Sequence, residues 1–393
     1  MYHPPASTPE TTPGDTAIQA RSNPEIIPEI PSSMLLDTAF IKDATKAIDL
    51  LYNRQYLLSL EVMEDWKKDF PNHPLWPLWP ALEAWWPIIV DLEDHQHDKE
   101  FLRAAEKVIS TCNDLLREDE NNLDAQIIRS IANGQVARYY SNRFRWYRSF
   151  RSARRALRDF FQIESVYPDI PDIHFGIGMY RYFAAYLVEA YPIATPIGWM
   201  LPRGDREEGL ERLKLAAENS IFMEPEAAYF LGHIYLHFEK EPDQALEYLK
   251  HIYDRYPNNS YFRRLYIRSL HQLQRDQEAL FAIEESLSMW QDGGSHEVTV
   301  MKEDLYTIRG IIHLQRQNLK TAKENFEKAV TASEKLRPFA TRKNLITSLF
   351  YLGEIHLENG NHQKARYYFA RASNPDAEHP NAKRAREALE SHF

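Results

Sequence analysis

The stretch YTIRGIIHLQRQNLKTAKENFEKA, residues 306–329, decides the fold. Its pattern returns 43 residues later as LFYLGEIHLENGNHQKARYYFARA, residues 349–372. Both copies keep the spacing of a glycine, an alanine and a phenylalanine, which are Gly310, Ala322 and Phe326, then Gly353, Ala365 and Phe369. Small residues let two helix backbones approach closely, while an aromatic ring fills the adjoining layer. The repeat therefore predicts stacked pairs of antiparallel helices.

In three other places, a proline follows a small residue at the same distance along the chain. The twelve-residue pairs are Ser59 with Pro71, Ala156 with Pro168, and Ala245 with Pro257. A proline at this position ends the second helix of a pair, because it cannot continue the backbone hydrogen bonds. This pattern of small, aromatic and proline residues resembles the tetratricopeptide repeat (TPR) family. The resemblance implies a right-handed superhelix with a concave groove.

Apolar residues recur at three- and four-residue intervals from Met34 onward, without sustained strand-like alternation. We therefore expect an all-α, TPR-like α-solenoid of about eight helical hairpins. The expected hairpins span 34–71, 78–119, 122–168, 171–221, 225–257, 258–290, 297–336 and 339–373. A capping helix over 380–392 should follow, since its single apolar stripe leaves a polar outer face.

The chain divides into three parts by composition and regularity. Residues 1–33 carry seven of the 23 prolines and few apolar side chains, which predicts a disordered tail. Residues 34–221 contain degenerate hairpins with insertions, and residues 222–393 contain more regular hairpins and the cap. One insertion is YPIATPIGWMLPRGD, residues 191–205. The run GDREEGL begins at the end of this insertion and is similar to a subgroup of TPR proteins. That resemblance implies a variant of the fold rather than an enzymatic reaction.

Composition limits the class of protein. The 393 residues are 44% hydrophobic with a formal net charge of -10, as in soluble globular proteins. One cysteine cannot form an internal disulfide. The N-terminus has no basic region followed by an apolar run, so we expect no secretory signal peptide. The default expectation is a cytoplasmic protein, and the alternative is a periplasmic one whose start follows a removed signal.

An arginine-rich segment, RYYSNRFRWYRSFRSARRALRDFF, covers residues 138–161. On a helix, Trp146, Phe150, Ala153, Leu157 and Phe160 would form one face, which we expect in the core. The opposite face would carry Arg148, Arg151, Arg155 and Arg158. These arginines either form a solvated face neutralised by acidic helices or bind an acidic peptide, a lipid head group or nucleic acid. With the negative net charge, a protein partner is favoured over nucleic acid.

Two aromatic segments are further candidates for partner contact. In LWPLWPALEAWWP, residues 75–87, Trp79 and Trp86 share a core face, whereas Trp76 and Trp85 could contact a partner. The insertion at 191–203 carries Trp199 among apolar residues. We expect it to fold back onto its own groove, with peripheral membrane contact through 191–202 as the alternative.

Signals for catalysis are poor. The sequence contains no P-loop, HExxH or GxSxG motif. His95 and His97 lie in a short polar loop with no further ligand in register, so we expect no metal site there. Gly176-x-Gly178 lacks the third glycine of a dinucleotide fingerprint and follows no strand. We therefore expect no enzyme and no cofactor.

The function predicted from the sequence is a non-enzymatic scaffold that binds another protein or an extended peptide along a TPR superhelix. The alternative is a binder of an anionic ligand, either nucleic acid or a lipid head group, through the arginine-rich helix at 138–158.

Overall fold

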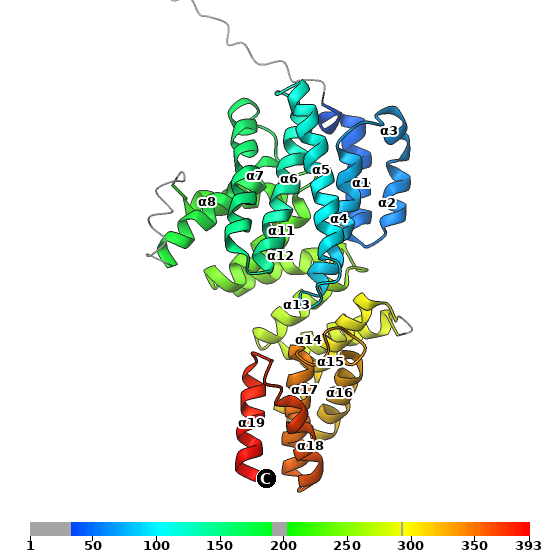
Figure 1. Cartoon of the computed structure of the whole chain (residues 1–393), viewed down its shortest axis with the longest axis vertical. Helices are drawn as coiled ribbons and strands as arrows, with labels where there is room; N and C mark the ends of the chain where they lie inside the picture. The colour runs from blue at the N-terminus through cyan, green and yellow to red at the C-terminus, as the bar shows by residue number, and fades with distance from the viewer. Residues whose placement is uncertain (1–32, 191–202, 292–293) are drawn as a thin grey trace, which may run out of the picture. The chain divides into compact units, whose positions relative to one another are not determined.

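Antiparallel helix pairs follow one another along the chain in the computed structural model, which describes residues 33–190, 203–291 and 294–393 (Figure 1). These residues contain helices and no β-strand. A 3-10 turn, Met34–Leu36, precedes the first pair, and a π-helical turn, Tyr235–Glu239, extends α11. The helices are α1 (Thr38–Tyr52), α2 (Tyr56–Val62), α3 (Glu64–Asp69), α4 (Leu75–Val90), α5 (Asp98–Glu118), α6 (Leu123–Asn142), α7 (Trp146–Val166), α8 (Ile173–Ala190), α10 (Arg206–Asn219), α11 (Glu224–Ile234), α12 (Pro242–Arg255), α13 (Ser260–Gln272), α14 (Asp276–Met289), α15 (His296–Gln315), α16 (Leu319–Ser333), α17 (Lys343–Glu358), α18 (His362–Ala372) and α19 (Pro380–His392).

The predicted hairpins are confirmed. Each of the eight predicted ranges contains one pair of consecutive helices, with the short α3 added to the first pair. The capping helix is α19, whose Ala382 and Ala385 are fully buried. The fold is therefore an all-α, TPR-like array of helical hairpins.

The turns within the hairpins share one backbone conformation. Six of them place a residue in the left-handed region, at φ between 55° and 70°: Arg54, Phe144, Lys240, Gln274, Gln317 and Gly360. In five of these turns the next amide donates to the carbonyl five residues back, as Arg145 N does to Tyr140 O at 2.8 Å. Such a bond satisfies a carbonyl at the end of the first helix and reverses the chain.

The first hairpin contacts the fifth and sixth hairpins, which is unexpected for a solenoid whose repeats touch only their neighbours. Tyr52 Oη donates to Glu226 Oε1 at 3.1 Å. Asn259 Nδ2 donates to the carbonyl of Tyr52 at 2.7 Å. Asp49 and Arg255 form an ion pair at 2.9 Å. The first half of the array is thus closed by contacts between residues about two hundred positions apart.

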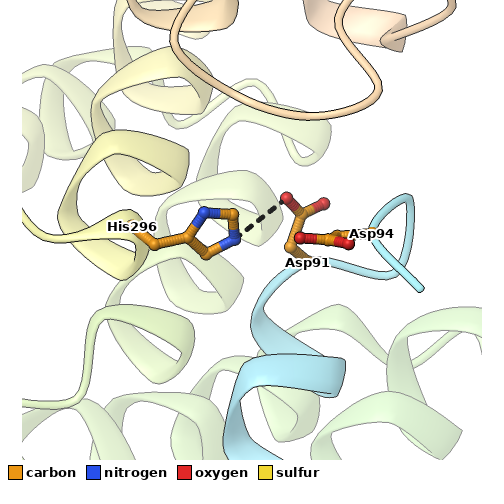
Figure 2. A group of neighbouring side chains, drawn as sticks. All are labelled: Asp91, Asp94 and His296. Atoms are coloured by element: carbon orange, nitrogen blue, oxygen red, sulfur yellow. Dashed lines mark ion pairs between the residues drawn. The ribbon is translucent and has the colours of Figure 1, made fainter. Parts of the chain in front are cut away.

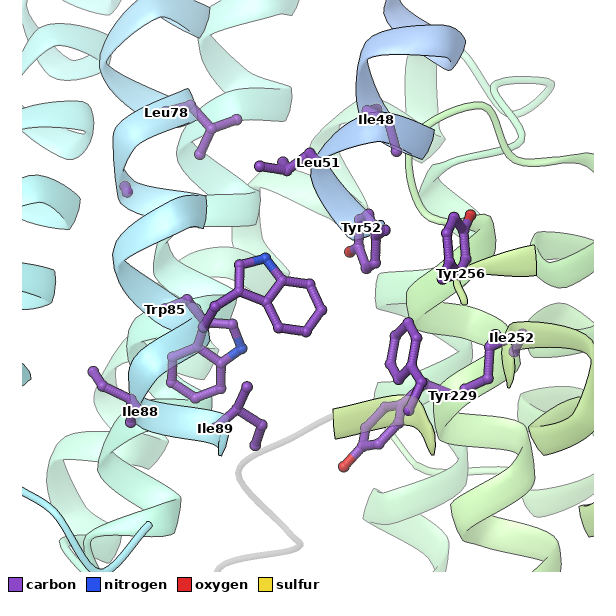
Figure 3. Packing of buried hydrophobic residues seen from close by; sticks show 14 of the residues in the cluster. Ile48, Leu51, Tyr52, Leu78, Trp85, Ile88, Ile89, Tyr229, Ile252 and Tyr256 are labelled. Carbon is purple, nitrogen blue, oxygen red and sulfur yellow. The ribbon is translucent and has the colours of Figure 1, made fainter. Parts of the chain in front are cut away.

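Aromatic and aliphatic side chains fill the inner face of this closed region (Figure 3). Tyr52 of α1 packs against Trp86 of α4 and Phe262 of α13, with ring centroids 5.5 and 6.2 Å apart. The space left between α1, α4, α6 and α11 is a cavity of about 40 Å³. A cavity of this size has room for about one water molecule. The side chains between these helices are therefore closely packed.

The division at residue 221 stays a prediction. The largest cluster of buried apolar residues draws on both sides of it, from Met34 to Ile312. None of the described helices combines the length and the apolar character needed to cross a lipid bilayer.

Candidate functional site

Helix α7 packs against its neighbours through small side chains. Its buried positions include Ser152, Ala156 and Phe160, and Ser149 Oγ donates to the carbonyl of Ala137 on α6 at 2.8 Å. Ala156 and Phe160 have the spacing of Ala322 and Phe326 in α16. The buried face of α7 is thus the face that the repeat pattern places in contact.

A buried ion pair fixes this orientation. Arg129 of α6 donates to both carboxylate oxygens of Asp159, from Nε at 2.8 Å and Nη2 at 2.9 Å. The side chain of Asp159 has no exposed surface. A bidentate guanidinium pair of this kind is among the stronger charge-assisted interactions. Because Arg129 satisfies Asp159, the neighbouring Arg158 reaches it only at 3.5 Å.

The expected aromatic core stripe of α7 is wrong at its N-terminal end. Trp146 is 63% exposed and Phe150 is 40% exposed. Phe144 in the preceding turn is 78% exposed, and Tyr147 is 75% exposed. The small face of α7 lies against α6, so the helix is rotated and these rings point outward. Four large aromatic side chains therefore lie together on the surface.

The arginines of α7 and of the turn before it have few acidic neighbours. Arg145, Arg148, Arg151, Arg154 and Arg155 are exposed and form no ion pair with any residue in the described ranges. The guanidinium of Arg148 lies 5.7 Å from the ring centre of Tyr140. The arginines are thus solvated, and both sequence interpretations of this face, a solvated face and a binding surface, stay open. We call the surface formed by Phe144, Arg145, Trp146, Tyr147, Arg148, Phe150, Arg151, Arg154, Arg155 and Arg158 the α7 surface.

Sequence reasoning missed Arg145, Arg154 and the exposure of the aromatic rings. The signal was present in the spacing of Ser149, Ser152 and Ala156, which defines a small-residue contact face. Because Arg154 lies opposite that face on a helix, this spacing predicts its exposure.

The other predicted aromatic contacts are Trp76, Trp85 and Trp199, of which the structure buries Trp85. Trp85 is 3% exposed and packs against Phe101 with ring centroids 5.3 Å apart. Trp76 is half-buried, and its Nε1 donates to the carbonyl of Phe70 at 2.6 Å. Trp85 is thus excluded as an exposed contact, whereas Trp76 as a partner contact stays a prediction. Trp199 and the segment 191–202 lie outside the described residues.

Three potential metal ligands meet where α4 ends near the start of α15 (Figure 2). Asp91, Asp94 and His296 place one ligand atom each within 4.8 Å of one another, and His296 Nε2 lies 3.3 Å from Asp91 Oδ2. Arg342 Nη1 also lies 3.0 Å from Asp91 Oδ2, and its Nη2 lies 2.8 Å from Glu303 Oε2. This guanidinium pairs with the buried carboxylates of Asp91 and Glu303, and its positive charge beside Asp91 would repel a metal cation. The cluster is thus a structural ion-pair network.

The charges in this network shift the pKa of Asp91. Burial raises the pKa, but the hydrogen bond with His296 and the charge of Arg342 outweigh burial, so the pKa is lowered. Asp91 is therefore ionised at neutral pH and joins α4 to the N-terminus of α17. His95 and His97 lie nearby in sequence but face Asp98 and Glu100 at 3.6 and 3.7 Å.

The C-terminal hairpins match a known family. The tetratricopeptide repeat family model matches residues 303–374, which include α16, α17 and α18. These residues are tetratricopeptide repeats. The hairpins that precede the TPR segment share its architecture in degenerate form.

Solved structures with a similar fold are distant. A human IFIT1 dimer with PPP-AAAA is 14% identical, covering 81% of this chain and 68% of that chain with a TM-score of 0.45. BtubC from P. vanneervenii is 16% identical, covering 76% and 94% with a TM-score of 0.36. Yeast Tom70 is 11% identical, covering 91% and 89% with a TM-score of 0.30. These likenesses carry no conclusion on function. None of the curated proteins matches this chain in sequence.

Proposed function

We propose that this helical-repeat scaffold is non-enzymatic and binds a partner protein through the α7 surface. Tyr52 and Trp86 pack together between the first hairpins, and the cavity beside them, of about 40 Å³, is too small for a peptide. The outer face of α7 is open. The proposal therefore places the binding site on this exposed helix face rather than in the groove that the sequence suggested.

The observation that carries the proposal is the joint exposure of aromatic and arginine side chains on one helix. Trp146 and Tyr147 leave most of their surface in water, so burial of these rings by a partner would add favourable apolar contact that the fold itself does not use. Tryptophan, tyrosine and arginine are also the residues that most often dominate binding energy at protein interfaces. The α7 surface has this composition, and among its arginines only Arg158 forms an ion pair within the described residues, with Asp159 at 3.5 Å.

A second function is favoured by the same chemistry. Exposed rings beside arginines can stack on the bases of a single-stranded nucleic acid while the guanidinium groups contact phosphates. Binding of that kind weakens steeply with salt, because each phosphate contact releases counterions. The salt dependence of binding separates the two functions.

The test is affinity capture with the tagged full-length chain at physiological salt. The double variant W146A/Y147A should lose the captured partner, whereas F281A should retain it. Phe281 on α14 is 74% exposed, so F281A removes a comparable exposed ring elsewhere. Nuclease treatment before capture shows whether the bound material is protein. Equal capture by both variants, or capture that depends on nucleic acid, would contradict the proposal.

A further inference from the structure

The α7 surface is divided along the helix axis. Its rings belong to residues 144–150, whereas four arginines occupy residues 151–158, where no aromatic side chain lies between them. The exposed apolar part is thus at the N-terminal end of the helix. The cationic part follows toward the C-terminus.

Resting on the proposed function, we infer that the α7 surface takes an acidic segment of the partner that carries an apolar side chain at one end. The apolar side chain packs among Phe144, Trp146 and Phe150. The carboxylates pair with Arg151, Arg154 and Arg155. Aspartate and glutamate suit these arginines because a guanidinium can hold a carboxylate with two parallel hydrogen bonds.

The length of the surface sets the length of the segment. Residues 146–158 span about 18 Å at the rise of an α-helix. An extended peptide covers that distance with about five or six residues. A short linear segment of the partner is therefore long enough to reach both parts.

The charge of the chain favours a short acidic segment over a long polyanion. Residues 144–158 contain six arginines and no acidic residue, yet the whole chain has a net charge of -10. Electrostatic attraction between exposed charges fades over about 8 Å at physiological ionic strength. A short segment thus senses mainly the arginines, whereas a nucleic acid or an anionic membrane extends over the acidic remainder.

The order of the side chains along α7 also favours an acidic segment over a nucleic acid. A nucleic acid strand offers a base and a phosphate in every unit, so it is matched by rings and cations that alternate along the whole surface. Here the rings stop at Phe150. The second half of the surface offers charge alone, which a run of carboxylates satisfies.

The experiment measures binding of fluorescent peptides to the full-length chain. The probe is a six-residue peptide with one leucine followed by glutamates, compared with the same peptide carrying glutamines and with one lacking leucine. The acidic probe should bind, and the glutamine peptide should not. The variant R151Q/R154Q/R155Q/R158Q should weaken binding by at least about tenfold, as expected for four exposed ion pairs.

A matched variant controls for net charge. K68Q/R117Q/K250Q/K383Q removes four positive charges from exposed surface ion pairs elsewhere and should bind the probe as the unmodified chain does. The advantage of leucine should disappear in W146A, because the apolar contact is then lost. The single variant R154Q repeats the test if the quadruple variant unfolds, as judged by circular dichroism.

Two results overturn the inference. One is a chain that binds an oligouridine strand or phosphatidylserine vesicles through the same arginines more tightly than the acidic probe. The other is an acidic probe that fails to bind while W146A/Y147A still loses the captured partner. That second result would leave the proposed function intact and show that the partner is not an acidic segment.

Discussion

The ring of Phe326 on α16 lies directly over Gly310 on α15, where a β-carbon would come within 2.6 Å of the ring. The same contact joins Gly353 to Phe369 at 2.6 Å, and Gly176 to Phe160 at 2.4 Å. A real β-carbon does not approach so closely, so each glycine makes room for the facing ring, within one hairpin at Gly310 and Gly353 and between two successive hairpins at Gly176. These contacts are the physical reason for the glycine and phenylalanine positions of the repeat pattern.

Substitution of these glycines should therefore depend on their position. G310A should lower the free energy of unfolding by about 1–3 kcal/mol, because the added methyl group overpacks the site against Phe326. Gly134 in α6 has nothing within 4 Å of an added β-carbon. G134A should raise stability by up to about 1 kcal/mol through helix propensity alone. Urea denaturation of both variants measures the difference, and equal effects would disprove this packing.

Substitution of the exposed arginines of α7 and substitution of Arg129 on α6 should differ in their effect on stability. R148Q/R151Q/R155Q/R158Q should change the free energy of unfolding by no more than about 0.5 kcal/mol per site, because these side chains are exposed. R129Q should cost about 3–5 kcal/mol, because it leaves Asp159 buried without its partner. Thermal unfolding monitored by circular dichroism tests both. A large loss in the quadruple variant would mean that the arginines hold the fold.

The pH dependence of stability should include a contribution from His233. Burial lowers the pKa of His233 to about 4, and the charges of His237 and Arg138 act in the same direction. Below the usual histidine pKa of about 6.5, the unfolded chain takes up a proton that the folded chain does not. Stability is therefore retained above pH 6.5 and lost as the pH falls toward 4, by on the order of 2 kcal/mol.

In the variant H233Q, the urea midpoint should change less between pH 7 and pH 4 than it does in the unmodified chain. H95Q is the control, since the side chain of His95 is 66% exposed and lies in a loop. An unchanged pH profile in H233Q would show that His233 gains its proton in the folded state as easily as in the unfolded state.

The N-terminal boundary predicted from the sequence can be tested by truncation. Deletion of residues 1–31 should leave thermal unfolding nearly unchanged, because this segment has few apolar side chains. Deletion of residues 1–35 should cost about 2–4 kcal/mol. It removes the buried Met34 and Leu35 and the backbone amide of Met34, which donates to Asp124 Oδ2 at 2.8 Å. Equal stability of the two truncated chains would contradict this N-terminal boundary of the folded array.

The hairpins could be predicted from the sequence because their contacts are local. Gly310, Ala322 and Phe326 lie within one helix pair, so packing leaves a fixed spacing that repeats along the chain. The pairing of Tyr52 with Glu226 joins single residues from distant hairpins and leaves no periodic signal. The closed inner face was therefore beyond sequence reasoning.

The orientation of α7 shows how two sequence signals can conflict. Trp146, Phe150 and Phe160 share an apolar stripe, whereas Ser149, Ser152 and Ala156 share a small-residue face. Hydrophobicity favoured the stripe, but close helix packing and the Arg129–Asp159 ion pair placed the small face inside. In a helical repeat, the small face is the better guide to burial.

The contact of the first hairpin with the fifth and sixth has a consequence during synthesis on the ribosome. A repeat array with only neighbouring contacts can fold one hairpin at a time as each emerges. Here the partners of Asp49 and Tyr52 at Arg255 and Asn259 are translated about two hundred residues later. The hairpin made first thus completes its contacts only after the fifth and sixth hairpins are made, and the chain has a higher contact order than its repeats suggest. Until Asn259 has left the ribosome, the aromatic inner face stays accessible to chaperones and to other nascent chains.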